Sequence, residues 1–414
     1  MSKIDELIKE KCLEGVEYRN ILDVISMKAR VGWQALTKKE YLQDGDYYLI
    51  TGTDFRVDGS IGFDSCVFVS KERFDMDEKI KIHANDILMT KDGTLGKVAF
   101  MKTEPPKPAT LNGGVYRLTV ISEEVLPRFM YHYFNSYEFK CFVEKVKTGG
   151  TIKHLTQKWF ETLRIPVPPI EVQQEIVCIL DSFTELELEL QAELEVRKKQ
   201  YEYYRDKLMD NANGRKGKLI EMLCQPVTDG PHTTPKLVSE GIPFISATAI
   251  HEGRIHFEDA QGFITKEFDE ECAKKYKPKR DDVYMVKSGS TTGKVGYVDT
   301  DVDFNIWSPL AAMRVNSENS ARYLFHLLQT QTIQHQVSTR MSHGSQPNLS
   351  MRVLEQFDVI IPTLQEQIRI VNILEKYDTL CNDNEKGLPA EIKARHKQYE
   401  YYRDKLLTFK RKEV

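Results

Sequence analysis

The chain has 414 residues, a formal net charge of −4 at pH 7 and a composition typical of globular proteins, which together predict two to three domains. No apolar run approaches the ~18–20 residues of a bilayer span, which excludes membrane-spanning helices, and the small net charge argues against a generic nucleic-acid binder. The seven cysteines are scattered without metal-ligand spacing, so we expect free thiols, a cytoplasmic location and no metal site.

Five segments are predicted in chain order. The charged N-terminus, 1–15, is helical in pattern and has no signal-peptide core. Globular domains over 16–168 and 213–362 are each followed by a helical spacer, at 169–212 and 363–414. Each globular segment is long enough to bury its own core.

The globular domains combine short strand-like runs with helical stretches. Strands are predicted at 47–51, 97–101, 114–120, 243–246 and 294–298, and helices at 127–146 and 320–337. This mixture indicates an α/β type of domain, present twice.

The duplication itself is explicit in the sequence. The phrase Gln-Tyr-Glu-Tyr-Tyr-Arg-Asp-Lys-Leu occurs at 200–208 and again, unchanged, at 398–406. Looser matches at offsets of 194 to 196 pair 86–98 with 282–295, 150–156 with 344–350, and 168–173 with 362–367. A period this long indicates two copies of a whole domain with its connector, and therefore internal pseudo-two-fold symmetry.

The two spacers show helical periodicity. Apolar residues after Pro169 step by three and four, which is the pattern of a helix seam: Ile176, Ile179, Phe183, Leu186 and Leu190. We expect one helix over 171–209 and an antiparallel partner from the second spacer, broken at Gly387-Leu388-Pro389 and resuming over 389–407. The alternative is that each helix folds back onto its own domain.

Charge is divided unevenly between spacer and domains. The segment 171–196 holds eight acidic residues and no Lys or Arg, so the rest of the chain carries +4. Basic residues gather late in the first copy and in the second copy, at Lys145, Lys147, Lys153 and Lys158, and at Lys274, Lys275, Lys277, Lys279 and Arg280. Such clusters are either solvated faces or nucleic-acid contacts joined by a spacer that does not bind DNA.

A first pair of loops has glycine, hydroxyl and lysine side chains suited to a phosphate backbone. It predicts DNA-contacting residues in both copies: Lys91, Thr94 and Lys97, then Lys287, Ser288, Ser290, Thr291 and Lys294. The glycine spacing is too short for a P-loop, and Val295 stands where Ser or Thr would follow the lysine. A plain hairpin turn is the alternative, and it is compatible with DNA contact.

A second pair of loops is rich in side chains that read base edges or phosphates. The candidate DNA-binding residues are Lys153, His154, His343, Ser345, Gln346 and Asn348. A capped turn is the alternative, because Thr156 or Ser350 can cap the helix that follows.

The repeated tyrosine phrase is predicted to serve seam packing, partner docking or both, since three tyrosines in four residues cannot all face one seam. The candidate partner-binding residues are Tyr201, Tyr203, Tyr204, Arg205, Tyr399, Tyr401, Tyr402 and Arg403. No GxSxG, HExxH, Walker A or GxGxxG motif is present, so no catalytic residue is assigned.

The whole chain resembles the specificity subunit of type I restriction-modification systems. The resemblance rests on the globular–helical order and on these stretches: Ser2 to Ile8, the Gly-Thr/Ser-x-x-Gly-Lys loops, Ile165 to Pro169 before a Glu/Gln-rich helix, Asp229 to Pro235, and Pro389 to Ile392 leading to the tyrosine phrase. It implies an α+β fold with two pseudo-symmetric α/β target-recognition domains joined by two long helices that form an antiparallel coiled coil.

The resemblance also implies a function without catalysis in this chain. Each recognition domain would read one half of a bipartite, asymmetric site on double-stranded DNA. The helices would set the gap and dock two methyltransferase subunits, which use S-adenosylmethionine, while restriction/motor subunits complete the cutting complex and this chain needs no cofactor. His232 and Thr233 are added as DNA-binding residues of the second copy, because the first has Arg30 to Gln34 near that place.

Two other functions stay open at this point. One is a protein-binding scaffold with duplicated domains, and the other is a nuclease or transferase with an unrecognised site. Salt-dependent DNA binding distinguishes the specificity subunit from the scaffold.

Overall fold

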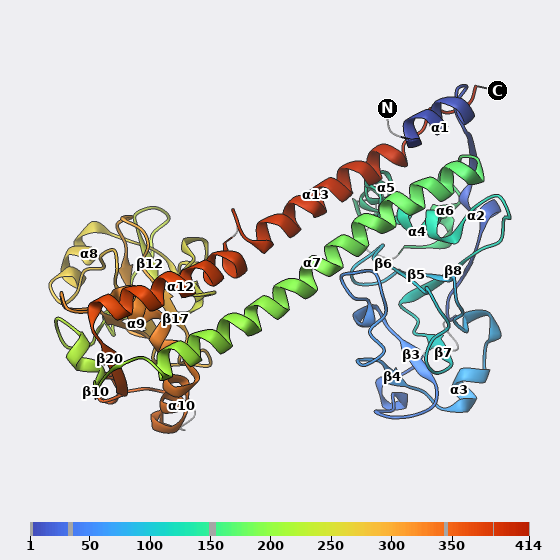
Figure 1. Cartoon of the computed structure of the whole chain (residues 1–414). Coiled ribbons are helices and arrows are strands. Elements are labelled where there is room, and N and C mark those ends of the chain that lie inside the picture. The colour runs from blue at the N-terminus through green and yellow to red at the C-terminus, as the bar shows by residue number, and fades with distance from the viewer. Residues whose placement is uncertain (1–2, 32–35, 149–154, 343–346, 384, 414) are drawn as a thin grey trace. The chain divides into compact units, whose positions relative to one another are not determined.

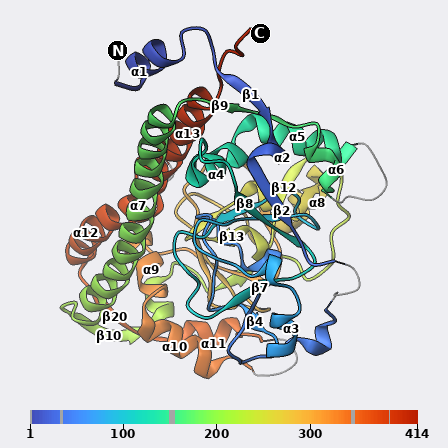
Figure 2. The same cartoon turned by 90° about the vertical axis from the view of Figure 1, so that its right-hand side faces the viewer.

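The structure is a computed structural model of the chain, and it describes residues 3–31, 36–148, 155–342, 347–383 and 385–413. These residues form two compact units (Figure 1), and Figure 2 gives a second view in which β1, β2 and β8 of the first unit face the reader. The first unit contains residues 1–191 and 392–414, and the second contains residues 192–391. Each unit therefore combines one globular copy with segments from both helical spacers.

The elements of the first unit follow the chain from the N-terminus to the long helix α7. Its helices are α1 (Lys3–Lys11), α2 (Ile21–Val24), α3 (Lys71–Asp75), α4 (Pro127–Asn135), α5 (Tyr137–Thr148), α6 (Gln157–Phe160), the first part of α7 (Ile170–Asp210) and most of α13 (Leu388–Leu406). Its strands are β1 (Glu17–Asn20), β2 (Ile25–Lys28), β3 (Tyr48–Ile50), β4 (Val67–Phe68), β5 (Ile87–Thr90), β6 (Val98–Phe100), β7 (Ala109–Leu111), β8 (Val115–Val120) and β9 (Arg164–Val167).

The second unit repeats this plan. Its helices are the end of α7, α8 (Lys266–Ala273), α9 (Ala321–Leu328), α10 (Gln331–Arg340), α11 (Met351–Glu355) and α12 (Leu364–Asn382). Its strands are β10 (Gly214–Lys218), β11 (Thr228–Asp229), β12 (Ile242–Ile245), β13 (Ile250–His251), β14 (Arg254–Ile255), β15 (Gly262–Ile264), β16 (Val283–Val286), β17 (Val295–Tyr297), β18 (Asn305–Ile306), β19 (Leu310–Met313) and β20 (Asp358–Pro362). Short 3-10 turns connect several of these elements in both units.

The two units share one sheet topology. The order β2-β8-β5-β6 in the first unit corresponds to β11-β19-β16-β17 in the second, and β4-β3-β7 corresponds to β15-β12-β18. In both three-stranded sheets the last pair is parallel, β3 with β7 and β12 with β18, while the first pair is antiparallel. The pairs β1–β9 and β10–β20 close each domain next to the helices. The predicted pair of pseudo-symmetric α/β domains is confirmed.

Strand alternation divides each domain between two apolar cores. In β5, Ile87 and Met89 pack with α4 and the start of α7, while Leu88 faces the core of the three-stranded sheet. In β16, Val283 packs in the core next to the helices, as Ile87 does. Tyr284 packs in the core of the three-stranded sheet, as Leu88 does. Because neighbouring side chains of a strand point to opposite faces, a continuous apolar strand serves both cores. The four-stranded sheet therefore has the helices on one face and the three-stranded sheet on the other.

The spacer α7 is one helix, as Figure 1 shows, and it pairs antiparallel within each unit. In the first unit Phe183 stacks on Tyr402 with centroids 5.5 Å apart, and Glu187 meets His396 at 3.2 Å. Residue numbers therefore rise along α7 while they fall along α13. In the second unit Tyr204 of α7 stacks on Tyr377 of α12 at 5.7 Å. The predicted antiparallel helices and the break before Leu388 are confirmed.

Two predicted helices are each interrupted once. The stretch 127–146 forms α4 and α5, because Ser136 between them has an extended backbone with ψ at 159°. The stretch 320–337 forms α9 and α10, because Thr330 is extended and its Oγ1 accepts a hydrogen bond from the Ile333 amide at 3.3 Å. Ser and Thr compete for backbone hydrogen bonds in this way, and periodicity alone does not reveal it.

The chain's two ends are joined inside the first unit. The Val16 amide donates to the Lys410 carbonyl at 2.9 Å, and the Lys412 amide donates to the Val16 carbonyl at 2.9 Å. Gly15 adopts φ of +94° and lies so close that a Cβ would meet the Lys410 oxygen at 2.6 Å.

None of the described helices combines the length and apolar character that crossing a membrane requires.

Candidate nucleic-acid interface

In both units the first predicted loop is hydrogen-bonded to the residue that directly follows the second predicted loop. In the first unit the Leu155 amide donates to the Lys91 carbonyl at 3.1 Å. In the second unit the Leu349 amide donates to the Lys287 carbonyl at 2.7 Å. These two hydrogen bonds join equivalent residues of the repeat, and in the second unit Asn348 of the second loop also forms a bridge with Ser288 of the first.

The first loop is a hairpin turn in both copies. In the first unit Gly96 donates its amide to the Thr90 carbonyl at 2.9 Å, and in the second Gly293 donates to Val286 at 2.8 Å. Gly96 and Gly293 have positive φ, at 75° and 97°, which suits glycine in a turn. The hairpin interpretation is therefore confirmed.

The loop lysines differ in their surroundings. Lys97 is half-buried and its Nζ donates to the Phe55 carbonyl at 2.5 Å, while Lys91 is half-buried with its Nζ 5.3 Å from the Tyr116 ring centroid. Lys294 is exposed, as are Thr94 and Ser290. Ser288 and Thr291 are half-buried. Lys294 is thus the loop cation of the second unit that lies most open to an approaching phosphate.

The second unit adds a buried carboxylate beneath this surface. Asp229 is fully buried, at the end of β11, and its Oδ2 lies 3.3 Å from the Lys287 Nζ. Its carboxylate also pairs with Lys275 and with His232, the latter at 3.3 Å. The ion pairs hold Lys287 inside the domain, whereas the side chains of Lys275 and His232 stay largely exposed. Asp229 therefore positions the Lys275 ammonium and the His232 imidazole at the rim, next to exposed Thr233.

A buried ion pair supports the sheet behind the loops in each copy. Asp86 of the first unit pairs with Arg117 at 2.7 Å, and Asp282 of the second pairs with Arg314 at 2.6 Å. Both carboxylates are almost fully buried and also accept a backbone hydrogen bond, from His83 and Lys279. Additional hydrogen bonds are what make such a buried pair tolerable.

The second predicted loop is described only in part. Asn348 is exposed and forms bridges with Ser288 and Ser342, and the Gly289 amide donates to the Pro347 carbonyl at 3.0 Å. Thr156 and Ser350 precede α6 and α11 as N-caps, but neither side chain makes the capping hydrogen bond. The remaining candidates of this loop lie outside the described residues: Lys153, His154, His343, Ser345 and Gln346.

Half of each tyrosine phrase faces inward. Tyr201 is buried and its hydroxyl lies 2.9 Å from His326 Nδ1, and Tyr399 makes the equivalent 3.4 Å contact with His132. The guanidinium of Arg205 lies 5.6 Å from the Tyr201 ring centroid, and Arg403 lies 5.4 Å from that of Tyr399. Burial lowers the pKa of His326 to about 3 and raises the pKa of Tyr399 to about 12. Tyr201 thus attaches the end of α7 to the second domain, and Tyr399 attaches α13 to the first domain.

The other half of each phrase faces outward. Tyr203 is 58% exposed and Tyr401 is 62% exposed, and each makes an edge contact of 5.3 Å with the next tyrosine, Tyr204 or Tyr402. The candidates Tyr201, Tyr399, Arg205 and Arg403 pack within their own units, so the exposed candidates of the two phrases are the outward tyrosines. The match in exposure between copies indicates two equivalent surfaces.

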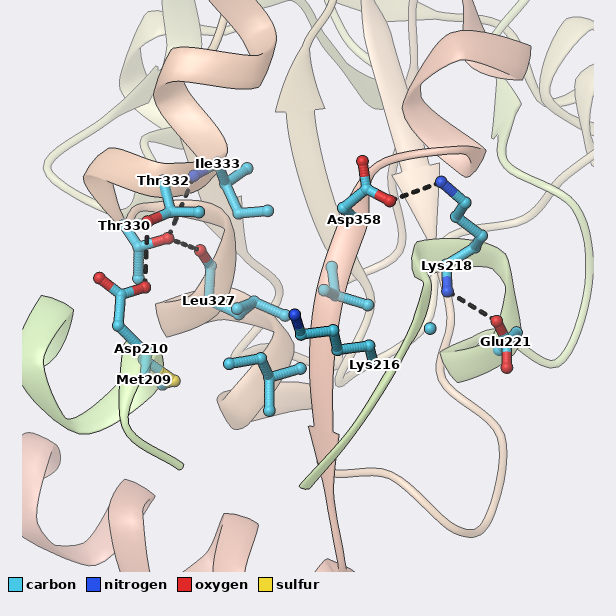
Figure 3. Close-up of a pocket in the computed structure, with 13 residues that line it drawn as sticks. Met209, Asp210, Lys216, Lys218, Glu221, Leu327, Thr330, Thr332, Ile333 and Asp358 are labelled. Carbon is cyan, nitrogen blue, oxygen red and sulfur yellow. Dashed lines mark hydrogen bonds and ion pairs between the residues drawn. The ribbon is translucent and has the colours of Figure 1, made fainter. Parts of the chain in front are cut away.

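A pocket of about 600 Å³ lies elsewhere in the second unit, where α7 ends against α10 and the β10–β20 pair (Figure 3). Several of its polar groups pair with one another: Thr332 donates to Asp210 at 3.0 Å, and Lys218 pairs with Asp358 at 2.5 Å. Met209, Leu327 and Ile333 supply apolar lining. The pocket is a junction between helix and sheet, and it does not include the loop residues.

A family model described as Type I restriction modification DNA specificity domain matches residues 14–196 and 231–394. The chain belongs to this family. It is a DNA-specificity subunit with two duplicated recognition domains, and the family supports a role without catalysis. The two matched segments correspond to the two copies of the repeat.

Curated relatives agree with this assignment. The chain is 30% identical over 302 residues to the EcoR124I/EcoR124II specificity subunit of Escherichia coli, covering 70% of this chain and 73% of that protein. It is 32% identical over 308 residues to a type I restriction enzyme specificity subunit, described as putative, of Haemophilus influenzae, covering 69% and 73%.

Solved structures show the same fold. A type I restriction-modification S subunit from M. genitalium aligns with a TM-score of 0.50 at 16% identity, covering 95% of this chain and 96% of the other. A chain from a study of complex assembly and conformational transition of the type I R-M system aligns with a TM-score of 0.57 at 17% identity, covering 93% and 97%.

Two pairs of buried polar residues that join the helices to the domains were not predicted from the sequence. His132 and His326 stand 194 residues apart, as do Gln173 and Gln367, and each pair makes equivalent buried contacts. Gln173 accepts from the Leu126 amide at 2.9 Å, and Gln367 accepts from Ser320 at 2.8 Å. Searching the repeat offset for isolated polar matches would have found them.

Proposed function

We propose that this DNA-specificity subunit reads a split, asymmetric site on double-stranded DNA, with one half-sequence recognised by each domain. The hydrogen bonds Leu155 to Lys91 and Leu349 to Lys287 support the proposal, because they join equivalent residues and so anchor the first loop in the same way in both copies. Divergent residues on that shared frame then supply different base readout, such as exposed Asn348 and His232 in the second unit.

The exposed groups divide into two kinds of contact. Lys294, Lys275 and Thr94 suit phosphate oxygens, which position a protein on DNA without reading sequence. His232, Ser290 and Asn348 suit base edges or phosphates. Buried Lys287 acts through Asp229 by holding the loop in place. Among the described residues, the proposed DNA contacts are therefore the exposed side chains on and beside the loops, and buried Lys287 is not one of them.

Helix α7 serves in this proposal as the spacer between the two half-sequences. It runs unbroken from Ile170 to Asp210, and at 1.5 Å per residue 41 residues extend for about 60 Å. A continuous helix resists changes in length, so the gap between the half-sequences is set by its residue count. The antiparallel partners α12 and α13 brace it within each unit.

The outward tyrosines form two equivalent docks for methyltransferase subunits. Those subunits supply S-adenosylmethionine chemistry on adenine, and restriction/motor subunits complete the cutting assembly in the cytoplasm. Tyrosine is enriched at protein interfaces. Two copies of one dock predict two copies of one partner, which suits pseudo-two-fold symmetry.

Domain exchange tests the reading of half-sequences. Residues 16–165 are replaced by the first domain of another specificity subunit, and the chimaera is expressed with the methyltransferase subunits. Mapping methylated adenines should show one changed half-sequence, one retained half and an unchanged gap. A motif altered in both halves would contradict the assignment of one half to each domain.

A scaffold without DNA contact is tested separately. Binding of the purified complex to DNA is measured at salt concentrations from about 50 to about 200 mM. Over this range, affinity that depends on phosphate contacts falls by orders of magnitude. The specificity subunit should give an affinity that falls steeply with salt, in proportion to the phosphates neutralised. Affinity independent of salt would favour the scaffold.

A further inference from the structure

The second recognition domain gathers two imidazoles and a carboxylate on one hairpin. His251 ends β13, His256 follows β14, and Asp259 ends the turn after it. One potential ligand atom from each lies within 4.8 Å of the others. The His251 and His256 rings stack at 3.6 Å, and His251 Nε2 lies 2.9 Å from the Asp259 carboxylate.

Glu258 orients the second imidazole of this cluster. His256 Nδ1 lies 3.2 Å from the Glu258 carboxylate, which favours a proton on Nδ1 and a lone pair on Nε2. That Nε2 is buried and has no hydrogen-bond partner among the described residues. A buried nitrogen without a partner costs free energy. A carboxylate that fixes the far nitrogen of a histidine is the usual support of a metal ligand.

We propose that His251, His256 and Asp259 bind one divalent transition-metal ion of the zinc class. Imidazole nitrogens suit Zn²⁺, Co²⁺ and Ni²⁺, whereas Mg²⁺ and Ca²⁺ prefer sets of oxygen ligands. Three protein ligands leave a fourth position, which faces solvent beside half-exposed Asp259. Glu258 is a positioning residue for His256.

Coordination requires a small local rearrangement. Tetrahedral zinc with bonds of about 2.0–2.1 Å places its ligand atoms about 3.3 Å apart. The three side chains therefore move together by ~1 Å, and one ring turns out of the stack so that its lone pair meets the ion. His251 and Asp259 are partly exposed, so their side chains have room for this movement.

The site would stabilise a hairpin next to the DNA-contact loop. Gly253, at its tip, accepts a hydrogen bond from the Tyr297 amide at 3.1 Å. The hairpin and the turn 292–294 line the same hollow of about 450 Å³. A bound ion links the hairpin to the turn that ends at Asp259, and so stiffens one wall of the surface carrying Lys294.

The first unit has the hairpin without the ligands. Gly59 matches Gly253, since its φ is also positive and its carbonyl accepts from the Phe100 amide at 2.9 Å. Counted from that glycine, the positions of His251, His256 and Asp259 hold Val57, Gly62 and Ser65. The chain is therefore expected to bind one ion and not two.

The test uses the full-length chain without an affinity tag, titrated with Co²⁺ and then Zn²⁺. Wild type should bind one ion per chain, and the visible absorption of Co²⁺ reports its coordination. His251→Gln, His256→Gln and Asp259→Asn should abolish this binding. Glu258→Gln should retain it with an affinity reduced about 10- to 100-fold. His83→Gln is the matched control, because His83 is an exposed histidine in the first unit, 3.4 Å from Glu104.

Circular dichroism checks that each variant is folded, and Glu258→Gln provides the comparison if a ligand variant unfolds. Loss in the ligand variants with retention in His83→Gln supports the site. Equal binding by wild type and His256→Gln, or no Co²⁺ binding by wild type at 100 μM, a concentration chosen here, would overturn it.

Discussion

Truncating the outward tyrosines tests docking separately from folding. Tyr203 and Tyr401 are 58% and 62% exposed, so their replacement by alanine removes few internal contacts. Surface substitutions of this kind change the free energy of unfolding by about 0.5 kcal/mol or less. A large effect of Tyr203→Ala or Tyr401→Ala on assembly would therefore come from the interface.

The size of that effect follows from the exposed area. A tyrosine offers roughly 200 Å², of which about 60% is free here, and burying about 120 Å² at 25 cal/mol per Å² contributes up to ~3 kcal/mol. With losses to side-chain ordering, 2–3 kcal/mol corresponds to about 30- to 150-fold in Kd per site. Tyr204 and Tyr402 stack on Tyr377 and Phe183, so they are kept unchanged.

Stoichiometry measured by native mass spectrometry distinguishes the two docks. Wild type should assemble with two methyltransferase subunits, each single variant should retain one near the wild-type Kd, and the double variant should retain neither at that concentration. Phe263→Ala, which removes an aromatic ring from a recognition domain, is the control. A double variant that still assembles with two subunits at unchanged affinity would refute the docking assignment.

Three further predictions concern DNA contact, pH and spacing. Lys294→Ala should lower the slope of log K against log salt by about 0.9, whereas Lys9→Ala on α1 should not, and an unchanged slope would remove Lys294 from the phosphate contacts. The folded-state pKa of His326, about 3, lies below the ordinary 6.5, so the unfolded state takes up the proton first. The free energy of unfolding should therefore fall as pH drops from 6.5 toward 3, by at most about 1.4 kcal/mol per pH unit. In urea unfolding, His326→Gln should show a weaker dependence of this free energy on pH than the wild type. An equal dependence would contradict the assignment. Four residues inserted after Leu190 add ~6 Å of helix and should lengthen the gap of the methylated motif by one to two base pairs, and an unaltered gap with full activity would refute the spacer role.

The duplication and the helical spacers could be read from the sequence alone. An identical nine-residue phrase at 200–208 and 398–406 needs no structure to show a repeat. The three-and-four spacing after Pro169 predicted α7, and Gly387-Leu388-Pro389 predicted the break before α13, because local sequence controls helix formation and interruption. The loops were also found, since glycine and lysine recur at matched places.

Only the tertiary structure decided which side chains of those motifs are available. Tyr201 and Tyr203 are two residues apart in one phrase, yet one bonds to His326 and the other faces solvent, because a helix turns successive residues to different sides. Lys287 and Lys294 likewise belong to one loop. Asp229, nearly sixty positions upstream, pairs with Lys287 inside the domain, whereas Lys294 is exposed. Such pairing depends on a strand order that no local pattern encodes.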